Sequence, residues 1–103
     1  MTLTLTWDQA KRRSNRLKHG LDFADAHEVL ESSIRWDVPV VRNGEARVQS
    51  FAYVFDRLRV LTVVHIPGMN AARIVSFRAA NEDEREAYHD WLAEEDDDPQ
   101  ASA

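Results

Sequence analysis

The chain contains no cysteine among its 103 residues. This excludes disulfides, thiolate catalysis and sulfur-ligated metal sites, and it fits a cytoplasmic protein. No segment approaches the roughly 20 apolar residues that a membrane-spanning helix needs. The N-terminal Met-Thr-Leu-Thr-Leu-Thr also lacks the basic and long apolar regions of a secretion signal. We therefore expect a cytoplasmic protein that is not attached to a membrane.

Internal repeats and linker segments are also missing. With 44% hydrophobic residues and a mean hydropathy of −0.51, the composition is that of one soluble domain with a modest core. We assign this domain to residues 1–94. Residues 95–103, which begin Glu95-Asp96-Asp97-Asp98, are expected to form a disordered acidic tail.

The net charge of −5 is unevenly distributed along the chain. Residues 1–80 hold 12 Lys and Arg against 8 Asp and Glu, a balance of +4, whereas residues 81–103 hold 1 Arg against 10 acids, a balance of −9. The basic body can therefore bind nucleic acid despite the acidic total. We interpret the acidic end as a solvated terminus. The alternative is a mimic of nucleic-acid charge, directed at the body or at a partner.

Helix-end signals mark a first helix from about Trp7 to His19. Thr6 and Gln9 fit a capping box, and Gly20 suits the left-handed residue that ends a helix. One helical stripe is predicted to pack and comprises Trp7, Ala10, Ser14, Leu17 and Leu21. The adjoining stripe is predicted to face solvent and comprises Lys11, Asn15 and Lys18. Further arginines on this helix, Arg12, Arg13 and Arg16, are expected to be solvated.

The rest of the chain predicts a sheet between helices. Asp22 can cap a short second helix that ends at Ser32-Ser33, and Asn81 with Glu84 forms a capping box for a last helix. Strands are predicted at residues 34–41, 47–55, 58–66 and 73–78, with a possible edge strand at residues 2–6 and a two-residue turn at Asp56-Arg57. This order indicates an α+β fold with two N-terminal helices on one face of a mainly antiparallel four- or five-stranded sheet, and a C-terminal helix.

The chain carries groups that suit RNA cleavage. RNA can be cut without a metal ion, because its own 2′-hydroxyl attacks the neighbouring phosphorus. Cations that hold the phosphate and a group that moves a proton then suffice. The candidates are Lys11, Lys18, His19, Arg47, Arg73 and Arg78. Arginine suits the phosphate, and proton transfer is assigned to His19, a perturbed lysine or Tyr88. We expect no metal ion and no cofactor.

Each candidate also has a structural alternative. His19 could hydrogen-bond a carbonyl group at the helix end, and this interpretation has equal weight. Arg47 and Arg78 could form salt bridges with Glu84 or Glu45. Because residues 73 and 78 differ by an odd number, a regular strand would point the two arginines to opposite faces.

Two separated motifs resemble the BrnT family of small bacterial toxins. The first comprises Trp7-Asp8, Lys11, Asn15, Lys18-His19-Gly20 and Phe23, and the second comprises residues 73–80, Glu84-Arg85 and Tyr88. The resemblance spans about residues 5–92. It implies a fold similar to the RelE and ParE toxins, and a ribonuclease toxin neutralised by a BrnA-like ribbon-helix-helix antitoxin. It also places functional weight on the basic helix end, on Glu45 and Arg47, and on the arginines of the last strand.

These observations lead to a specific prediction of function. The chain is expected to be a metal-independent RNA endonuclease that inhibits translation, with His19, Arg47, Arg78 and Lys18 as catalytic residues. RNA contacts are assigned to Lys11, Asn15, Arg73 and Glu45. We expect a hetero-oligomer with the antitoxin, which alone contacts operator DNA. One alternative is a catalytically silent co-repressor that only binds the antitoxin. A weaker one, a DNA-mimicking inhibitor, is disfavoured by the basic body.

Overall fold

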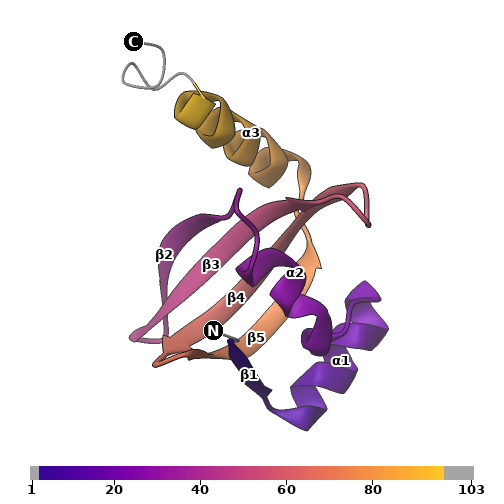
Figure 1. Ribbon diagram of the computed structural model, residues 1–103. Coiled ribbons are helices and arrows are strands. Elements are labelled where there is room, and N and C mark those ends of the chain that lie inside the picture. Colours follow the sequence, from indigo (N-terminus) through magenta and orange to yellow (C-terminus); the bar gives the residue numbers. More distant parts are fainter. Residues whose placement is uncertain (1–2, 97–103) are drawn as a thin grey trace.

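The computed structural model describes residues 3–96. Its elements in chain order are β1 (Thr4–Trp7), α1 (Gln9–His19), the 3₁₀ helix η1 (Phe23–Ala26), α2 (His27–Leu30), β2 (Trp36–Arg42), β3 (Glu45–Val54), β4 (Arg59–Gly68), β5 (Ala71–Ala79) and α3 (Glu82–Asp96). The predicted α+β class and order of elements are confirmed (Figure 1). None of the helices in this part of the chain is long and apolar enough to cross a membrane.

The five strands form one sheet in the order β1-β5-β4-β3-β2. Strands β2 to β5 pair antiparallel through successive hairpins, while β1 runs parallel to β5 at the edge. The edge strand proposed for residues 2–6 therefore exists, shifted to Thr4–Trp7. It pairs with β5 only as far as Ile74, so the rest of β5 has no strand on that side.

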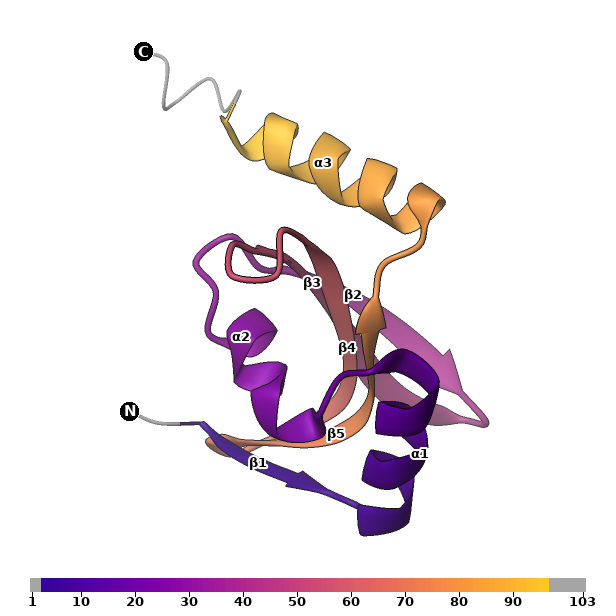
Figure 2. The same ribbon diagram turned by 90° about the vertical axis from the view of Figure 1, so that its right-hand side faces the viewer.

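Both faces of the sheet are covered in part. On one face, Ala52 and Val54 of β3 pack in a core cluster with Phe23 of η1 and Val29 of α2. On the other face, Phe51 packs with Tyr88 of α3. These opposite placements follow the alternation of side chains along a regular strand. Figure 2 shows α3 at the opposite end of the molecule from β1, so it covers only one end of its face.

The last helix begins as its sequence predicts. The backbone nitrogen of Asn81 donates to Glu84 Oε1 at 2.9 Å, and the backbone nitrogen of Glu84 donates to Asn81 Oδ1 at 2.8 Å. Further along, the fully buried Tyr88 donates its hydroxyl to the Ile34 carbonyl at 2.7 Å. Tyr88 is therefore a structural residue and is withdrawn as a candidate for proton transfer. The helix continues to Asp96, and residues 97–103 of the predicted tail lie outside the described residues.

The start of α1 differs from its prediction. Trp7 belongs to β1, where it pairs with Ile74, so Thr6 cannot cap the helix. Asp8 is the cap instead, and its carboxylate accepts hydrogen bonds from the amide nitrogens of Ala10 and Lys11. The predicted end is confirmed, because Gly20 has a φ of 73° and donates to the Arg16 carbonyl at 2.8 Å.

The packed face of α1 also differs from its prediction. Leu17 is 91% exposed, whereas Asn15 is only 8% exposed. Asn15 Nδ2 donates to the Phe77 carbonyl at 2.8 Å, and Asn15 Oδ1 accepts from the Phe77 amide at 3.1 Å. This side chain thus takes the place of a strand on the edge of β5 that β1 does not reach. A hydrogen-bonded amide, and not an apolar stripe, fixes α1 to the sheet.

Arg12, which was expected to be solvated, forms an ion pair instead, and Arg57 does so too. Arg12 meets Asp22 at 2.7 Å and stacks over the Trp7 ring at 5.1 Å, which ties α1 to the segment that begins η1. Arg57 pairs with Asp25 and Glu28 and so fixes the β3–β4 loop to α2. That loop has four residues, Phe55–Leu58, and not the two predicted, with Leu58 at a φ of 56°.

Candidate nucleic-acid interface

A β-bulge in β5 determines which side chains reach the uncovered face of the sheet. Val64 of β4 pairs with Ser76, but the next residue, His65, pairs with Ile74, which leaves Val75 as an extra residue. Ile74 and Phe77 therefore both point into the same core cluster. Arg73 and Arg78, which are their neighbours in the strand, therefore both lie on the other face. The prediction that they point to opposite faces is wrong, because it assumed a regular strand.

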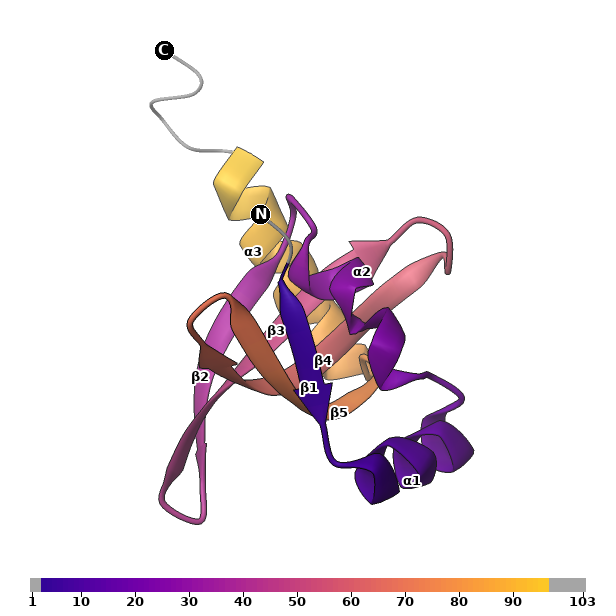
Figure 3. The ribbon, with the colours of Figure 1, turned by 60° about the horizontal axis from the view of Figure 1, so that its bottom comes forward.

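A groove of about 630 Å³ lies on this face, at the end that α3 leaves uncovered. Four cationic residues from four elements line it: Lys11 of α1, Arg42 of β2, Arg47 of β3 and Arg78 of β5. The other lining residues are Val40, Val41, Asn43, Gln49, Val64, Val75 and Ser76, so none of the described lining residues is acidic. Figure 3 shows the β2–β3 hairpin and α1 on either side of β4 and β5. We call this the cationic groove.

A smaller depression of about 290 Å³ adjoins the cationic groove. It shares Lys11, Val75 and Ser76 with the groove, and α1 adds Ser14, Asn15, Lys18 and His19. Six predicted site residues thus border one continuous surface, although they are up to 67 positions apart in the sequence: Lys11, Asn15, Lys18, His19, Arg47 and Arg78.

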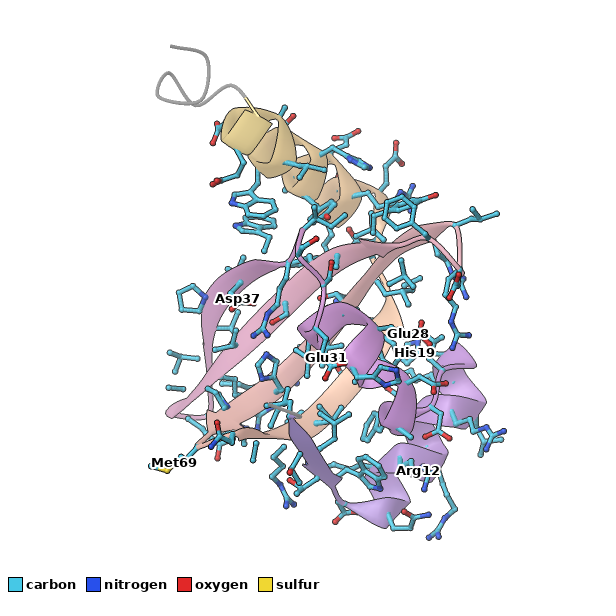
Figure 4. All side chains as sticks on the ribbon, viewed as in Figure 1. Arg12, His19, Glu28, Glu31, Asp37 and Met69 are labelled. Atoms are coloured by element: carbon cyan, nitrogen blue, oxygen red, sulfur yellow. The ribbon has the colours of Figure 1, made fainter. Side chains whose placement is uncertain are left out.

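Another groove, of about 560 Å³, lies between α2 and the β3–β4 loop. Its lining includes the carboxylates of Glu28, Glu31 and Asp56, two of which are labelled in Figure 4. A polyanion is repelled by such a lining. We therefore place the nucleic-acid interface at the cationic groove and not here.

His19 is the exposed last residue of α1, seen in Figure 4 at the end of that helix. Partial desolvation, with the positive charges of Lys18 and Arg78, lowers the pKa of His19 below its ordinary value. The neutral imidazole is therefore favoured at pH 7, and this is the form that accepts a proton.

Arg78 is held in place by Glu84. Its Nη1 and Nη2 donate to the two carboxylate oxygens at 2.7 and 2.9 Å. The hydrogen bonds from Arg78 are the main reason why the pKa of Glu84 falls to about 2. The salt bridge considered as an alternative for Arg78 is thus present, in a residue that also lines the groove.

Arg47 also pairs with a carboxylate, but through one contact only. Its Nε donates to Glu45 Oε1 at 2.9 Å. No described residue accepts from its two terminal nitrogens, so these can receive a phosphate. Glu45 is 51% exposed and is absent from the groove lining. Its contact in the structure is with Arg47, and its predicted contact with RNA stays a prediction.

Two other predicted RNA contacts are placed differently from the groove cations. Asn15 lines the smaller depression, but its buried amide is engaged with Phe77 and Leu21 and holds α1 to the sheet. Arg73 is exposed on the groove face but lines neither depression.

Sequence reasoning missed Arg42 and Gln49. The signal for Gln49 was the alternation along β3, which places it on the face of Arg47. Arg42 lies opposite Glu45 in the β2–β3 strand register, so its side chain is on the same face of the sheet as that of Arg47.

Among the described residues, no three His, Asp or Glu side chains gather where they could hold a metal ion. Comparison with curated proteins found no match to the chain. A family model described as "Ribonuclease toxin, BrnT, of type II toxin-antitoxin system" matches residues 7–84. The matched region runs from Trp7 to Glu84 and contains every residue that lines the cationic groove. The chain belongs to the BrnT family of ribonuclease toxins of type II toxin–antitoxin systems.

Proposed function

We propose that the cationic groove holds an RNA phosphodiester and that the chain cuts RNA internally, by attack of the 2′-hydroxyl, without a metal ion. The observation that carries this proposal is the meeting of Lys11, Arg47 and Arg78, from three elements, on one surface beside His19. The new bond joins the 2′-oxygen to phosphorus, and the bond to the 5′-oxygen breaks. The products are a 2′,3′-cyclic phosphate and a free 5′-hydroxyl.

Each residue has a defined part in this step. Arg47 and Arg78 bind the non-bridging oxygens and stabilise the extra charge of the phosphorane. His19, neutral at pH 7, takes the proton of the 2′-hydroxyl, and the ammonium of Lys18 supplies a proton to the leaving 5′-oxygen. Lys11 and Arg42, together with Arg73 outside the lining, bind the neighbouring phosphates.

In the cell, cleavage of RNA would inhibit translation. The family implies an antitoxin partner. We propose that this partner is a small BrnA-like ribbon-helix-helix protein, that the two form a hetero-oligomer, and that the toxin approaches operator DNA only through it. The charge balance of +4 over residues 1–80 supports binding to RNA.

Cleavage of RNA by the purified chain tests the proposal. Cleavage is expected with EDTA present, and the products should carry 2′,3′-cyclic or 3′-phosphate ends. Loss of cleavage in EDTA and its return with magnesium would overturn the metal-free mechanism. A chain that binds its antitoxin but cuts no RNA would instead be the co-repressor.

A further inference from the structure

Gln49 lies on the floor of the cationic groove, on the same strand as Arg47 and linked to Arg78 through Glu84. We propose that its side-chain carbonyl oxygen accepts a hydrogen bond from the 2′-hydroxyl of the nucleotide whose 3′-phosphate is bound by Arg47 and Arg78. Gln49 thereby distinguishes RNA from DNA. This inference rests on the proposed function of the groove and adds a specificity-determining residue to it.

The orientation of the Gln49 amide is fixed by its partner on α3. Gln49 Nε2 lies 3.1 Å from Glu84 Oε2. Because Glu84 is ionised and paired with Arg78, its carboxylate can only accept hydrogen bonds. The nitrogen end of the amide, and not the oxygen end, must therefore face Glu84.

A second contact fixes the other amide hydrogen. The Thr62 hydroxyl donates to the Ser50 carbonyl at 3.0 Å, so its oxygen is left to accept from Gln49 Nε2 at 3.2 Å. Thr62 and Ser50 are both buried in the sheet. Rotation of the amide would place its oxygen against Glu84 and break both contacts, so the carbonyl oxygen is held in one direction.

That oxygen is available to a ligand. No described residue donates a hydrogen bond to Gln49 Oε1. The one buried side-chain polar atom without a partner in the described part of the chain is His65 Nδ1, so Gln49 Oε1 is in contact with solvent. It is a fixed acceptor in a groove whose charged lining residues are all donors.

The 2′-hydroxyl is the RNA donor that fits this position. It sits on the ribose carbon next to the one that carries the 3′-phosphate, whereas the amino groups of the bases lie beyond the sugar. DNA has no donor there and would leave the carbonyl oxygen unpaired when it displaced water. An amide oxygen is too weakly basic to take the proton, so Gln49 holds the hydroxyl in the bound substrate. The O–H bond then turns from Gln49 to His19, which takes the proton as the 2′-oxygen attacks phosphorus.

Two uncleavable ligands test the inference. One is a DNA hexamer whose last nucleotide alone is a ribonucleotide and which ends in a 3′-phosphate; the other is the all-DNA counterpart. The intact protein should bind the ribonucleotide form about three- to tenfold more tightly, as expected for one net hydrogen bond.

Gln49→Met, similar in length but without a carbonyl, should bind both ligands equally. Asn43→Gly is the matched control: it removes another amide from the groove lining, at a φ of 53° that glycine tolerates, and should keep the ratio.

The outcomes separate the inference from the proposed function. Binding of neither ligand by the intact protein would contradict the proposed role of the groove. Equal binding of both would overturn the role of Gln49 alone. If Gln49→Met weakened both ligands and kept their ratio, Gln49 would only support Glu84, and the inference would fail. If Gln49→Met does not fold, Gln49→Asn is the second variant. Its side chain is one methylene shorter, so its carbonyl oxygen lies further from the ligand.

Discussion

Arg78 at the end of β5 and Glu84 in the first turn of α3 join at two points, with Nη1–Oε1 at 2.7 Å and Nη2–Oε2 at 2.9 Å. The same carboxylate completes the capping box of α3 with Asn81 and accepts from Gln49. One side chain therefore fixes both the start of the last helix and a cation of the candidate site. A change at this carboxylate is expected to affect stability and activity together.

Arg47→Ala should reduce RNA cleavage without loss of stability. By analogy with removal of one oxyanion donor, kcat/KM should fall about 10²- to 10³-fold. The melting temperature should stay nearly unchanged, because Glu45, which loses its partner, is 51% exposed. Arg59→Ala, at an exposed position at the start of β4, is the control and should cleave normally. Normal cleavage by Arg47→Ala would remove Arg47 from the site.

Arg78→Ala should reduce cleavage to a similar degree and should also destabilise the fold. The Glu84 side chain is only 20% exposed and would lose two charged hydrogen bonds, at a cost of about 1–3 kcal/mol. Urea unfolding at pH 7, compared with that of Arg47→Ala, measures this difference. Equal midpoints for the two variants would show that the ion pair contributes little.

His19→Gln should lower the rate of cleavage at pH 7 by about 10²- to 10⁴-fold. A base must be neutral, and the pKa of His19 is lowered, so the rate of the unmodified protein should fall only as the pH drops below 6.5. This acidic limb should be lost from the variant's pH–rate profile. His27→Gln, at an exposed position on α2, is the control. An unchanged profile in His19→Gln would favour its structural alternative at the end of α1.

The buried His65 should make stability depend on pH. Burial lowers its pKa from 6.5 to about 4, so below pH 6.5 the unfolded chain binds a proton that the folded chain does not. The free energy of unfolding that the neutral His65 contributes is fully present above pH 6.5 and is lost as the pH falls toward 4. Between pH 7 and pH 5 the loss should be about 2 kcal/mol relative to His65→Gln. Urea unfolding of the two proteins at both pH values measures it, with the exposed His89→Gln as control.

Deletion of residues 97–103 should raise RNA affinity only modestly. The deletion removes Asp97 and Asp98 and leaves all of α3 in place. A solvated tail acts through long-range repulsion, which salt screens. RNA binding by the full and shortened chains at two salt concentrations measures the effect. A gain above tenfold at low salt that fades at high salt would instead identify a charge mimic that competes with RNA.

Much of the fold follows from local signals in the sequence. The Asn81–Glu84 capping box and Gly20 at the end of α1 depend on neighbouring residues, and both are confirmed. The packing of α1 does not follow, because it depends on Phe77, which is 62 positions from Asn15. A helical wheel cannot show that an asparagine completes the edge of a strand.

The candidate site was predictable in its residue types but not in its arrangement. Arginine and lysine at the ends of elements indicated an anion site, and six of the expected residues border one surface. Their common face depends on the bulge at Val75, which shows only when β4 and β5 are paired. The ion pairs of Arg47 and Arg78 were expected as alternatives to function. The ion pairs are compatible with the proposed function, because Arg47 and Arg78 still line the groove while they are paired with carboxylates.

The extra residue at Val75 lets both halves of β5 keep their faces. If β5 paired with β4 without the bulge, its second half would turn over, so that Phe77 would leave the core and Arg78 would enter it. Deletion of Val75 alone would not have this effect, because Ser76 would then follow Ile74 directly and keep its pairing with Val64. A β5 shortened by one codon at this point is therefore expected to keep both the core and the charged face of the groove, whereas the loss of a second codon would exchange them.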